Sequence, residues 1–499
     1  MNVHLNRFLV LAHRWGGIGM CVLVVLWFFS GIVMLYVGYP KLTPAERLAH
    51  VPVLNGPMLE GQSCCVSLSE AWQALPSDSA ARGVRLATVA GAPIYRFELH
   101  HGLAAVDASS GKRVTEVNAE RALASARAFM PGVEASYVAQ VDSDIWTRGS
   151  QLNPHRPLHR VQMHDEAGTV LYVSSATAEV VRDAPRWERR WNFVGPWLHW
   201  LHMFRSPEIL WRSIIFVTCA VGLALAATGI VLGISRWRFR GRYASGRKTP
   251  YREPYMRWHH VSGLIFSAIT LTWLLSGLLS INPWGLFGWT AMSHNAGAEA
   301  QSELSPARFS IEAGAALAAF APALQVRELE WHVVNGKAYF VGRDIDGATR
   351  LLTGDGAQIS ERLPTADVVR AAESMRPGVA ILHAEELDQY DDYYYSRAVH
   401  TLRGHEDRPL PVVRVQFGDE KQTWAYLNPR TGADVLWQDA GQRSQRWWFV
   451  LLHSWDSRTM LASPIVRDIV LIVLCFGGLA MGVTGSVIGY RRLRNRIRA

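Results

Sequence analysis

Four long apolar segments divide the chain and predict four membrane-spanning helices. A helix needs about 20 mostly apolar residues to cross a bilayer, and none of these segments carries a Lys or Arg beyond its second residue. The segments cover residues 16–39, 211–235, 258–281 and 466–490. The first is too long for a signal peptide and no small-residue cleavage motif follows it, so we interpret it as a retained helix.

The two long segments between the spans, residues 40–210 and 282–465, have a different pattern. Short apolar strands are separated by turn residues such as Asn-Pro and Gly, as in residues 426–435, and this arrangement is typical of hairpins. Helical stretches at residues 118–129 and 366–375 are each followed by a Pro-Gly pair, which ends a helix. We therefore expect two α+β domains with antiparallel sheets.

Basic residues gather at one end of the predicted spans. Residues 1–15, 236–257 and 491–499 together hold 15 Lys and Arg against one acidic residue, in a chain of formal net charge +9. Short loops rich in Lys and Arg stay in the cytoplasm, so we expect both termini there and the two long segments in the periplasm of a bacterium. This charge fits anionic headgroups of the inner membrane, and we expect no nucleic-acid binding.

The second half of the sequence repeats motifs of the first half. The spacing between matching residues is 246 near the start of each half and grows toward its end. Residues 156–158 match residues 408–410 at a spacing of 252, and Thr228 matches Thr484 at 256. A spacing that drifts in one direction is typical of a tandem duplication. Matches at a spacing of 246 are His13 with His259, Gly17 with Gly263, Trp27 with Trp273, Ser30 with Ser276, and Gly31 with Gly277.

Six of the 18 histidines lie near the ends of the predicted spans. Because the motifs repeat, a histidine near an end in one half has a counterpart in the other half. The histidines near the cytoplasmic ends are His13, His259 and its neighbour His260. Those near the opposite ends are His199, His202 and His453.

Two neutral imidazoles on facing helices are the axial ligands that a b-type haem requires. One helix cannot supply axial ligands to both faces of a porphyrin, whereas two helices, one from each repeat, can. We therefore predict two haems, one between His13 and His259 and one between His199 and His453. The repeated Gly and Trp residues would let a porphyrin approach and flank the rings, and interfacial Arg residues such as Arg14 would meet its propionates.

Two of these assignments have neighbouring alternatives. His199 is preferred to His202 because the order Leu-His followed by Trp or Ser matches His453 best. His259 is preferred to His260, which has no counterpart in the first half. The alternative for each histidine taken singly is that it only anchors a helix end at the membrane surface.

The five cysteines give no sign of a metal site. They lack the Cys-x-x-Cys or Cys/His spacing of zinc sites. Adjacent Cα atoms are about 3.8 Å apart, too close for an easy disulfide, so we expect Cys64 and Cys65 to be free thiols. No nucleotide-binding motif or Ser/His/Asp set is recognised.

Several motifs together resemble the PepSY-associated transmembrane family (PepSY_TM). They span nearly the whole chain, and the helices begin with His-Arg-Trp-x-Gly and end with Thr-Gly-x-x-x-Gly. The resemblance implies a membrane α-helical fold with four transmembrane helices in two tandem repeats and two α+β PepSY-like periplasmic domains. The matching stretches are residues 13–17, 36–43, 156–159, 199–201, 446–447, 452–454 and 484–485.

Members of this family include inner-membrane haem proteins that reduce ferric siderophores. The resemblance therefore implies a di-haem electron carrier that reduces a ferric siderophore or another iron chelate in the periplasm. The electron donor, a quinol or a cytoplasmic reductase, stays open. The segments outside the membrane are larger here than in the shorter reductases, which leaves the substrate open. The alternative is a haem-free regulatory or inhibitory membrane protein that binds a peptidase or an envelope partner.

Overall fold

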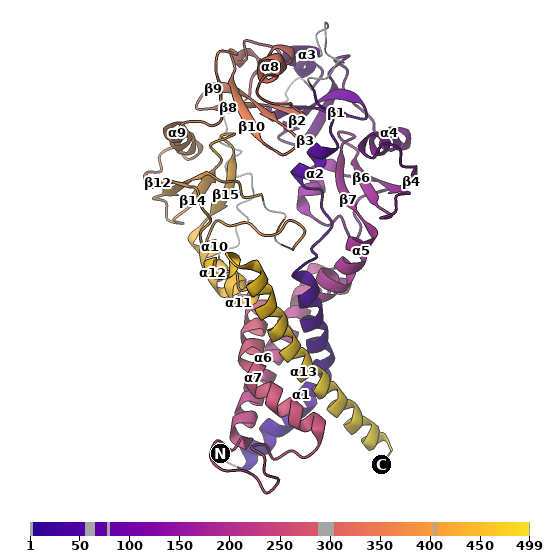
Figure 1. Cartoon of the computed structure of the whole chain (residues 1–499), viewed down its shortest axis with the longest axis vertical. Helices are drawn as coiled ribbons and strands as arrows, with labels where there is room; N and C mark the ends of the chain where they lie inside the picture. The colour runs from indigo at the N-terminus through magenta and orange to yellow at the C-terminus, as the bar shows by residue number, and fades with distance from the viewer. Residues whose placement is uncertain are drawn as a thin grey trace.

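The structure, a computed structural model, describes residues 3–54, 65–76, 80–287, 304–402, 404 and 407–498. Its long axis runs from a helical bundle, which holds both termini at its far end, to a broader region of three sheets (Figure 1). The two ends of the chain therefore lie on the same side of the bundle.

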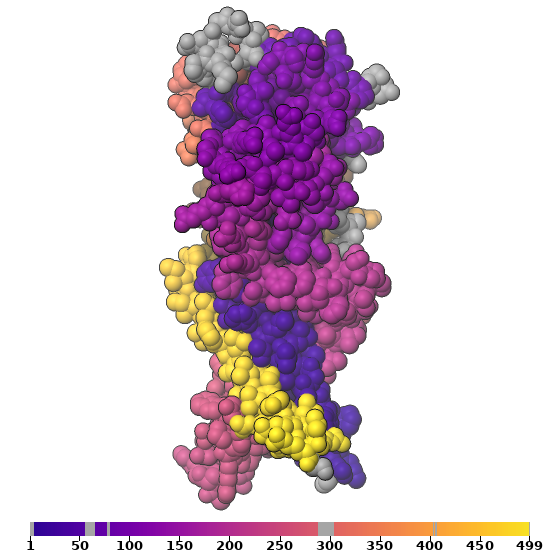
Figure 2. Space-filling model, turned by 90° about the vertical axis from the view of Figure 1, so that its right-hand side faces the viewer, coloured from indigo at the N-terminus to yellow at the C-terminus, as the bar shows by residue number. Residues whose placement is uncertain are grey.

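Four helices of the described chain are long and apolar enough to cross a membrane. The helix α1 contacts α13 and α6, and α7 closes the bundle by contacting α6 and α13. Figure 2 shows α1 and α13 side by side along the bundle. The four helices are α1 (Val3–Met34), α6 (Glu208–Arg236), α7 (Pro254–Ser280) and α13 (Pro464–Ile497).

Glycines of α13 allow the close helix contacts. A Cβ atom at Gly477 would collide with the ring of Phe266 in α7, and one at Gly478 would collide with Phe28 in α1. The helix α1 ends at Met34, before the expected end of the span at residue 39. The chain turns there because the amide of Gly38 donates to the carbonyl of His400, 2.8 Å away, and no longer to the helix.

A seven-stranded antiparallel sheet lies farthest from the bundle and contains strands from both halves of the chain. Its order is β11-β10-β9-β8-β1-β2-β3. At the centre β1 pairs with β8, with Val84 opposite Trp331 and Arg85 opposite Glu330. The segments expected as separate domains therefore share one sheet. Its strands are β1 (Ala81–Val89), β2 (Ala92–Leu99), β3 (Gly102–Asp107), β8 (Glu328–Val334), β9 (Lys337–Arg343), β10 (Thr349–Thr353) and β11 (Ile359–Ser360).

Each half also has a four-stranded antiparallel sheet covered by one helix of 11 residues. In the first half, α4 (Ala119–Phe129) covers β4 (Ala135–Val141), β5 (Leu158–Met163), β6 (Val170–Ser174) and β7 (Val180–Ala184). In the second half, α9 (Thr365–Met375) covers β12 (Ile381–Leu387), β13 (Val412–Phe417), β14 (Trp424–Leu427) and β15 (Asp434–Gln438).

The main strands and helices follow a similar order in the two halves. The helices α4 and α9 begin at Ala119 and Thr365, a spacing of 246, whereas β5 and β13 begin at Leu158 and Val412, a spacing of 254. The sequence match of residues 156–158 with 408–410, at 252, is thus displaced slightly from the structural correspondence. Identical tripeptides outweighed the strand register in that comparison.

Short helices connect these parts. The connections into α6 and α13 have the same form, because a helix leads into a π-helical turn in both. They are α5 (Arg186–Asn192) with the π turn Phe193–Trp197, and α10 (Ala440–Gln445) with the π turn Arg446–Leu451. The remaining helices are α2 (Pro44–Ala49), α3 (Leu68–Gln73), α8 (Ala313–Phe320), α11 (Leu452–Ser454) and α12 (Arg458–Leu461), with 3-10 turns at Ser150–His155, His202–Phe204 and Pro306–Arg308.

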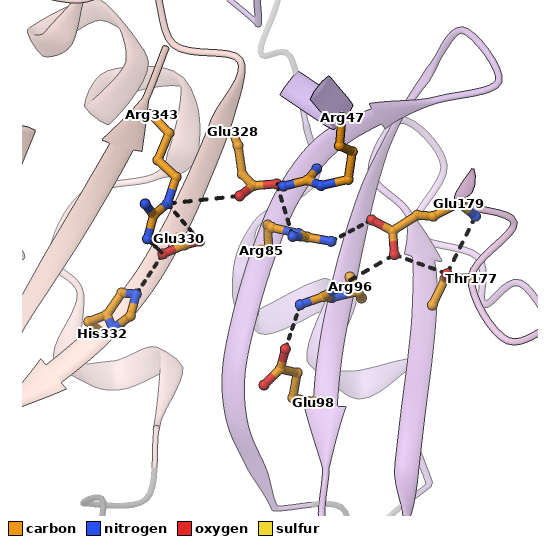
Figure 3. A network of polar contacts seen from close by, with 10 residues as sticks. All are labelled: Arg47, Arg85, Arg96, Glu98, Thr177, Glu179, Glu328, Glu330, His332 and Arg343. Atoms are coloured by element: carbon orange, nitrogen blue, oxygen red, sulfur yellow. Dashed lines mark hydrogen bonds and ion pairs between the residues drawn. The ribbon is translucent and has the colours of Figure 1, made fainter. Parts of the chain in front are cut away.

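A network of buried charges ties the two halves together beside the β1–β8 pairing (Figure 3). The carboxylate of Glu328, which is 1% exposed, lies 2.6 Å from the guanidinium of Arg47 and 3.1 Å from that of Arg85. Arg85 also pairs with Glu179 at 2.6 Å. Each buried charge therefore has an opposite charge within reach, as buried ions require.

One expectation about the cysteines is wrong. Cys65 is disulfide-bonded, and Cys64 lies outside the described residues. The expectation of a free thiol relied on the spacing of neighbouring Cα atoms alone. Cys21, Cys219 and Cys475 are free, and the last two are buried in the bundle.

Candidate functional site

Two histidines from different halves face each other near the end of the bundle that holds the termini. His13 of α1 and His259 of α7 have ring centroids 6.3 Å apart, with planes at 51°. The Nδ1 of His13 lies 3.1 Å from the carbonyl of Leu225, and the Nδ1 of His259 lies 3.0 Å from that of Met481. A carbonyl only accepts, so each Nδ1 carries the proton and each Nε2 keeps its lone pair.

A second pair lies at the end of the bundle nearest the sheets. His199 and His453 have ring centroids 6.1 Å apart, with planes at 80°. Their Nδ1 atoms lie 2.9 Å from the hydroxyls of Ser30 and Ser276. Each hydroxyl donates to a carbonyl one turn earlier in its own helix, so it accepts from Nδ1–H. These rings have the same tautomer as the first pair.

The two separations match imidazoles that share one metal ion. A metal–imidazole bond is ~2 Å long and the bonding nitrogen is ~1 Å from its ring centroid, so two rings on one ion have centroids about 6 Å apart. No group of three or more His, Cys, Asp or Glu in the described residues is arranged to hold a metal. Paired imidazoles without further ligands suit haem, because the porphyrin supplies the other four nitrogens.

Glycines of α6 and α13 make room for the first pair of rings. A Cβ atom at Gly229 would lie 2.8 Å from Cε1 of His13, and one at Gly485 would lie 3.3 Å from Cε1 of His259. Near the same rings, added Cβ atoms at Gly17 and Gly263 would meet nothing within 4 Å. The chain thus leaves open space at these two glycines, each four residues after a histidine of the pair.

We expect Gly229→Ala to lower the haem content of the purified protein. A contact of 2.8 Å is closer than real Cβ atoms come, so the His13 ring must move from its position opposite His259. Gly19→Ala is the matched control, because Gly19 is exposed in α1 and its Cβ would meet nothing within 4 Å. Equal haem content per chain in both variants, measured by pyridine haemochrome, would contradict the assignment.

A cavity of about 730 Å³ contains the second pair. It is large enough for a cofactor, since ligand cavities typically have ~300–1,000 Å³. In addition to His199 and His453, it is lined by two pairs of identical residues at a spacing of 246: Trp27 and Trp273, and Gly31 and Gly277. Bulky aromatic walls beside glycines can hold a flat ring and exclude water from it.

The two alternative histidines do not face another histidine. His260 is buried, and its ring nitrogens lie 2.7 Å from the hydroxyl of Thr249 and 2.9 Å from the carbonyl of Gly233, so it fastens the loop after α6. His202 lines the cavity, and its Nδ1 lies 2.7 Å from the hydroxyl of Tyr39. The structure brings His199, rather than His202, opposite His453.

Sequence reasoning did not find the groups that orient the histidines. Ser30 and Ser276 were noted only as repeated residues, although their common spacing of 246 is the signal that points to them. The carbonyls of Leu225 and Met481 leave no sequence signal, because every residue has a carbonyl. Such partners fix the tautomer and orientation of a metal-binding imidazole.

A partly buried group of ionisable residues fastens the loop after β12 above this cavity. The ring of His400 lies 2.9 Å from Glu46 and 3.0 Å from Glu188, and Lys41 donates to the carbonyl of Thr401 at 2.8 Å. Burial, opposed by His400, raises the pKa of Glu188 to about 7. The next residue of that loop, Leu402, lines the cavity.

The contribution of Glu188 to the stability of the folded protein should therefore fall as the pH rises. The folded-state pKa of Glu188 lies above its ordinary value of 4.5, so its stabilising proton is present below pH 4.5 and is lost as the pH rises through about 7. His400, Asp183, Glu46 and Lys41 face this carboxyl. Between about pH 5 and pH 8, we expect the contribution of Glu188 to the free energy of unfolding to fall by on the order of 2 kcal/mol.

Denaturant unfolding in detergent at several pH values would measure this fall. Glu188→Gln should flatten the pH dependence, because an amide does not titrate. Glu361→Gln should leave it unchanged, since that side chain is 75% exposed. Equal pH dependence in the two variants would contradict the role of Glu188.

The comparisons with known proteins agree with this architecture. The family described as PepSY-associated TM region matches residues 10–492, which include all four long helices apart from their outer ends. No curated protein matches the chain. The match covers nearly the whole sequence, and the chain belongs to the PepSY-associated TM family.

Proposed function

We propose that this protein is an inner-membrane oxidoreductase that holds two b-type haems and passes electrons across the membrane to a ferric chelate. The observation that carries the proposal is that two pairs of imidazoles face each other, with ring centroids 6.3 and 6.1 Å apart. Each pair has one ring from the first half of the chain and one from the second. Facing rings with Nδ1 protonated and a fixed orientation favour metal ligation over a role as helix anchors.

Residues of the chain support this proposal at both positions. His13 and His259 would hold one haem, and His199 and His453 the other. Bound haem iron carries one electron at a time between its ferric and ferrous states. The protein supplies the axial ligands, while Trp27 and other apolar groups in the wall of the second cavity exclude water.

The proposed direction of electron transfer is toward the sheets. The basic segments at the other end favour a cytoplasmic location for both termini, and the sheets would then lie in the periplasm. Electrons would enter at the His13–His259 haem from a quinol or a cytoplasmic reductase. A ferric siderophore or other iron chelate would receive them near the His199–His453 haem, because Fe(II) leaves oxygen ligands more readily than Fe(III) does.

We also propose that the two halves derive from a tandem duplication. The strands β4 and β12 begin at Ala135 and Ile381, a spacing of 246 that the helices preceding them share. The central strand pairing has the same relation. A spacing of 246 makes Val84 correspond to Glu330 and Arg85 to Trp331, and each of these residues lies opposite the counterpart of its neighbour: Val84 opposite Trp331, and Arg85 opposite Glu330. A pseudo-two-fold axis between β1 and β8 accounts for both observations.

The test is an absorption spectrum of the purified full-length protein with pyridine-haemochrome quantitation. We expect two b-type haems per chain and a low-spin spectrum of bis-histidine iron. Reduced protein in lipid vesicles should then transfer electrons to an added ferric chelate, with Fe(II) trapped by a chromogenic chelator. Colourless protein from haem-replete cells would refute the proposal and favour the haem-free regulatory alternative.

A further inference from the structure

The part of the cavity that faces the sheets is lined by cations. No Asp or Glu is among the described residues that line it. These cations come from both halves and from the loops that connect the helices to the sheets. We call them the arginine mouth: Lys41, Arg148, Arg182, Arg205, Arg212, Arg397 and Arg467.

Several members of the arginine mouth are held by neighbouring groups of the protein. Arg467 lies 3.2 Å from Asp456, Arg182 donates to the carbonyl of Trp146, and Lys41 donates to a carbonyl of the loop above the cavity. These contacts position the cations and partly offset their charge. We therefore regard these three cations as part of the wall of the cavity.

Arg148 and Arg205 differ from the others. Both side chains are exposed, and neither forms an ion pair with a carboxylate of the described chain. The guanidinium of Arg205 lies over the ring of Trp211, 4.3 Å from its centroid, which holds it in place without neutralising it. Two uncompensated cations at the opening of a cavity, one of them held in place, attract an anion.

Neutral aromatic groups complete the site. The ring of His202 lies 5.4 Å from that of Trp200 and 6.3 Å from that of Trp211. Burial and the charges of Arg205 and Arg148 lower the pKa of His202 to about 4. The ring is therefore uncharged at neutral pH, and with the hydroxyl of Tyr39 it offers hydrogen bonds to a bound ligand.

We propose that Arg148 and Arg205 bind the carboxylates of a negatively charged ferric chelate at the mouth of the cavity. The proposal rests on the proposed function, because it names the class of chelate that would be reduced there. Guanidinium groups bind carboxylates through paired, charge-assisted hydrogen bonds. A neutral chelate, such as a ferric trihydroxamate, gains nothing from these charges. The propionates of a haem in the cavity have the same carboxylate chemistry, and the test separates the two.

The test compares the double variant Arg148→Gln/Arg205→Gln with Arg113→Gln/Arg127→Gln. The control removes the same charge at exposed positions in the sheet region, one in the turn after β3 and one in α4. The probe is gallium(III) citrate, a redox-inert anionic chelate, with a neutral gallium(III) trihydroxamate as the comparison. Binding to the full chain is followed by tryptophan fluorescence at low ionic strength, and haem content is measured on the same samples.

Loss of two charge-assisted contacts should weaken gallium citrate binding by about 10-fold or more in the mouth variant. The control should bind as the unmodified protein does, and trihydroxamate affinity should be the same in all three. Unchanged citrate affinity, or an equal loss for both chelates, would overturn the proposal. Reduced haem content with unchanged citrate affinity would assign the two arginines to the propionates instead and would also overturn it. Because binding does not depend on electron transfer, colourless protein refutes the proposed function without deciding this one.

Discussion

His13→Ala and His453→Ala should each remove one of the two haems from the purified protein. Each variant deletes one of the two axial imidazoles of its site, and the remaining ring, 6.3 or 6.1 Å away in the intact protein, cannot hold the iron on both faces. We expect about half the haem per chain in either variant and none in the double variant. Pyridine-haemochrome quantitation and the reduced-minus-oxidised spectrum measure this directly.

The neighbouring histidines provide matched controls. His202→Ala alters the same cavity as His453→Ala, and His260→Ala lies next to His259, yet neither ring faces a second imidazole. Both controls should keep two haems per chain. An unchanged spectrum in both His13→Ala and His453→Ala, or equal loss in the controls, would refute the ligand assignment.

Glu328→Gln should destabilise the region of the sheets by about 3–5 kcal/mol, the usual effect of removing one partner from a buried ion pair. Glu328 is the carboxylate that Arg47 and Arg85 share, at 2.6 and 3.1 Å (Figure 3). An amide has no charge to offset the two guanidiniums, so they would remain buried without compensation. The free energy of unfolding can be measured by denaturant titration in detergent, followed by tryptophan fluorescence.

The matched control is Glu98→Gln in the same network. Glu98 pairs with Arg96 through a side chain that is 51% exposed, and exposed pairs contribute about 0–1 kcal/mol. We expect Glu98→Gln to change the free energy of unfolding by less than about 1 kcal/mol. A similar small effect for Glu328→Gln would show that water reaches the joint between the halves.

Local patterns predicted the helical bundle well. Long apolar runs specify a helix by composition alone, and the structure has long helices at all four places. The start of α7 was predicted later than Pro254, although Glu253 and Pro254 form a recognisable helix start in which the Glu253 carboxylate accepts from the amide of Met256. Capping residues therefore hold boundary information that hydropathy lacks.

Contacts between distant parts of the chain were not predictable in this way. The pairing of β1 with β8 joins strands from opposite halves of the sequence, and no local pattern encodes such a partner. The order of residues around His199 already favoured it over His202 in the sequence. The backbone adds a similarity that the sequence does not indicate, because His199 and His453 each lie two residues before a left-handed residue that is not glycine, Leu201 and Trp455.

The arginine mouth was also missed for a physical reason. Arg148, Arg205 and Arg397 come from three separate loops, and each one looks like an ordinary surface cation in the sequence. Only the fold brings them to one opening. Interfacial arginines were expected near a haem, but the sequence does not indicate which of them lack a carboxylate partner.

The division of each imidazole pair between the halves has a consequence for how the chain can be built. One half alone contains a single ring of each pair, so it could complete both sites only by joining a second copy around a two-fold axis. In the intact chain, the loop after α6 connects the two halves covalently, and His260 fastens this loop to the bundle. The arrangement that two copies of one half would form is thus present within one polypeptide. A single polypeptide also lets the two halves differ in sequence: His202 lies three residues after His199, whereas Asp456 lies three residues after His453.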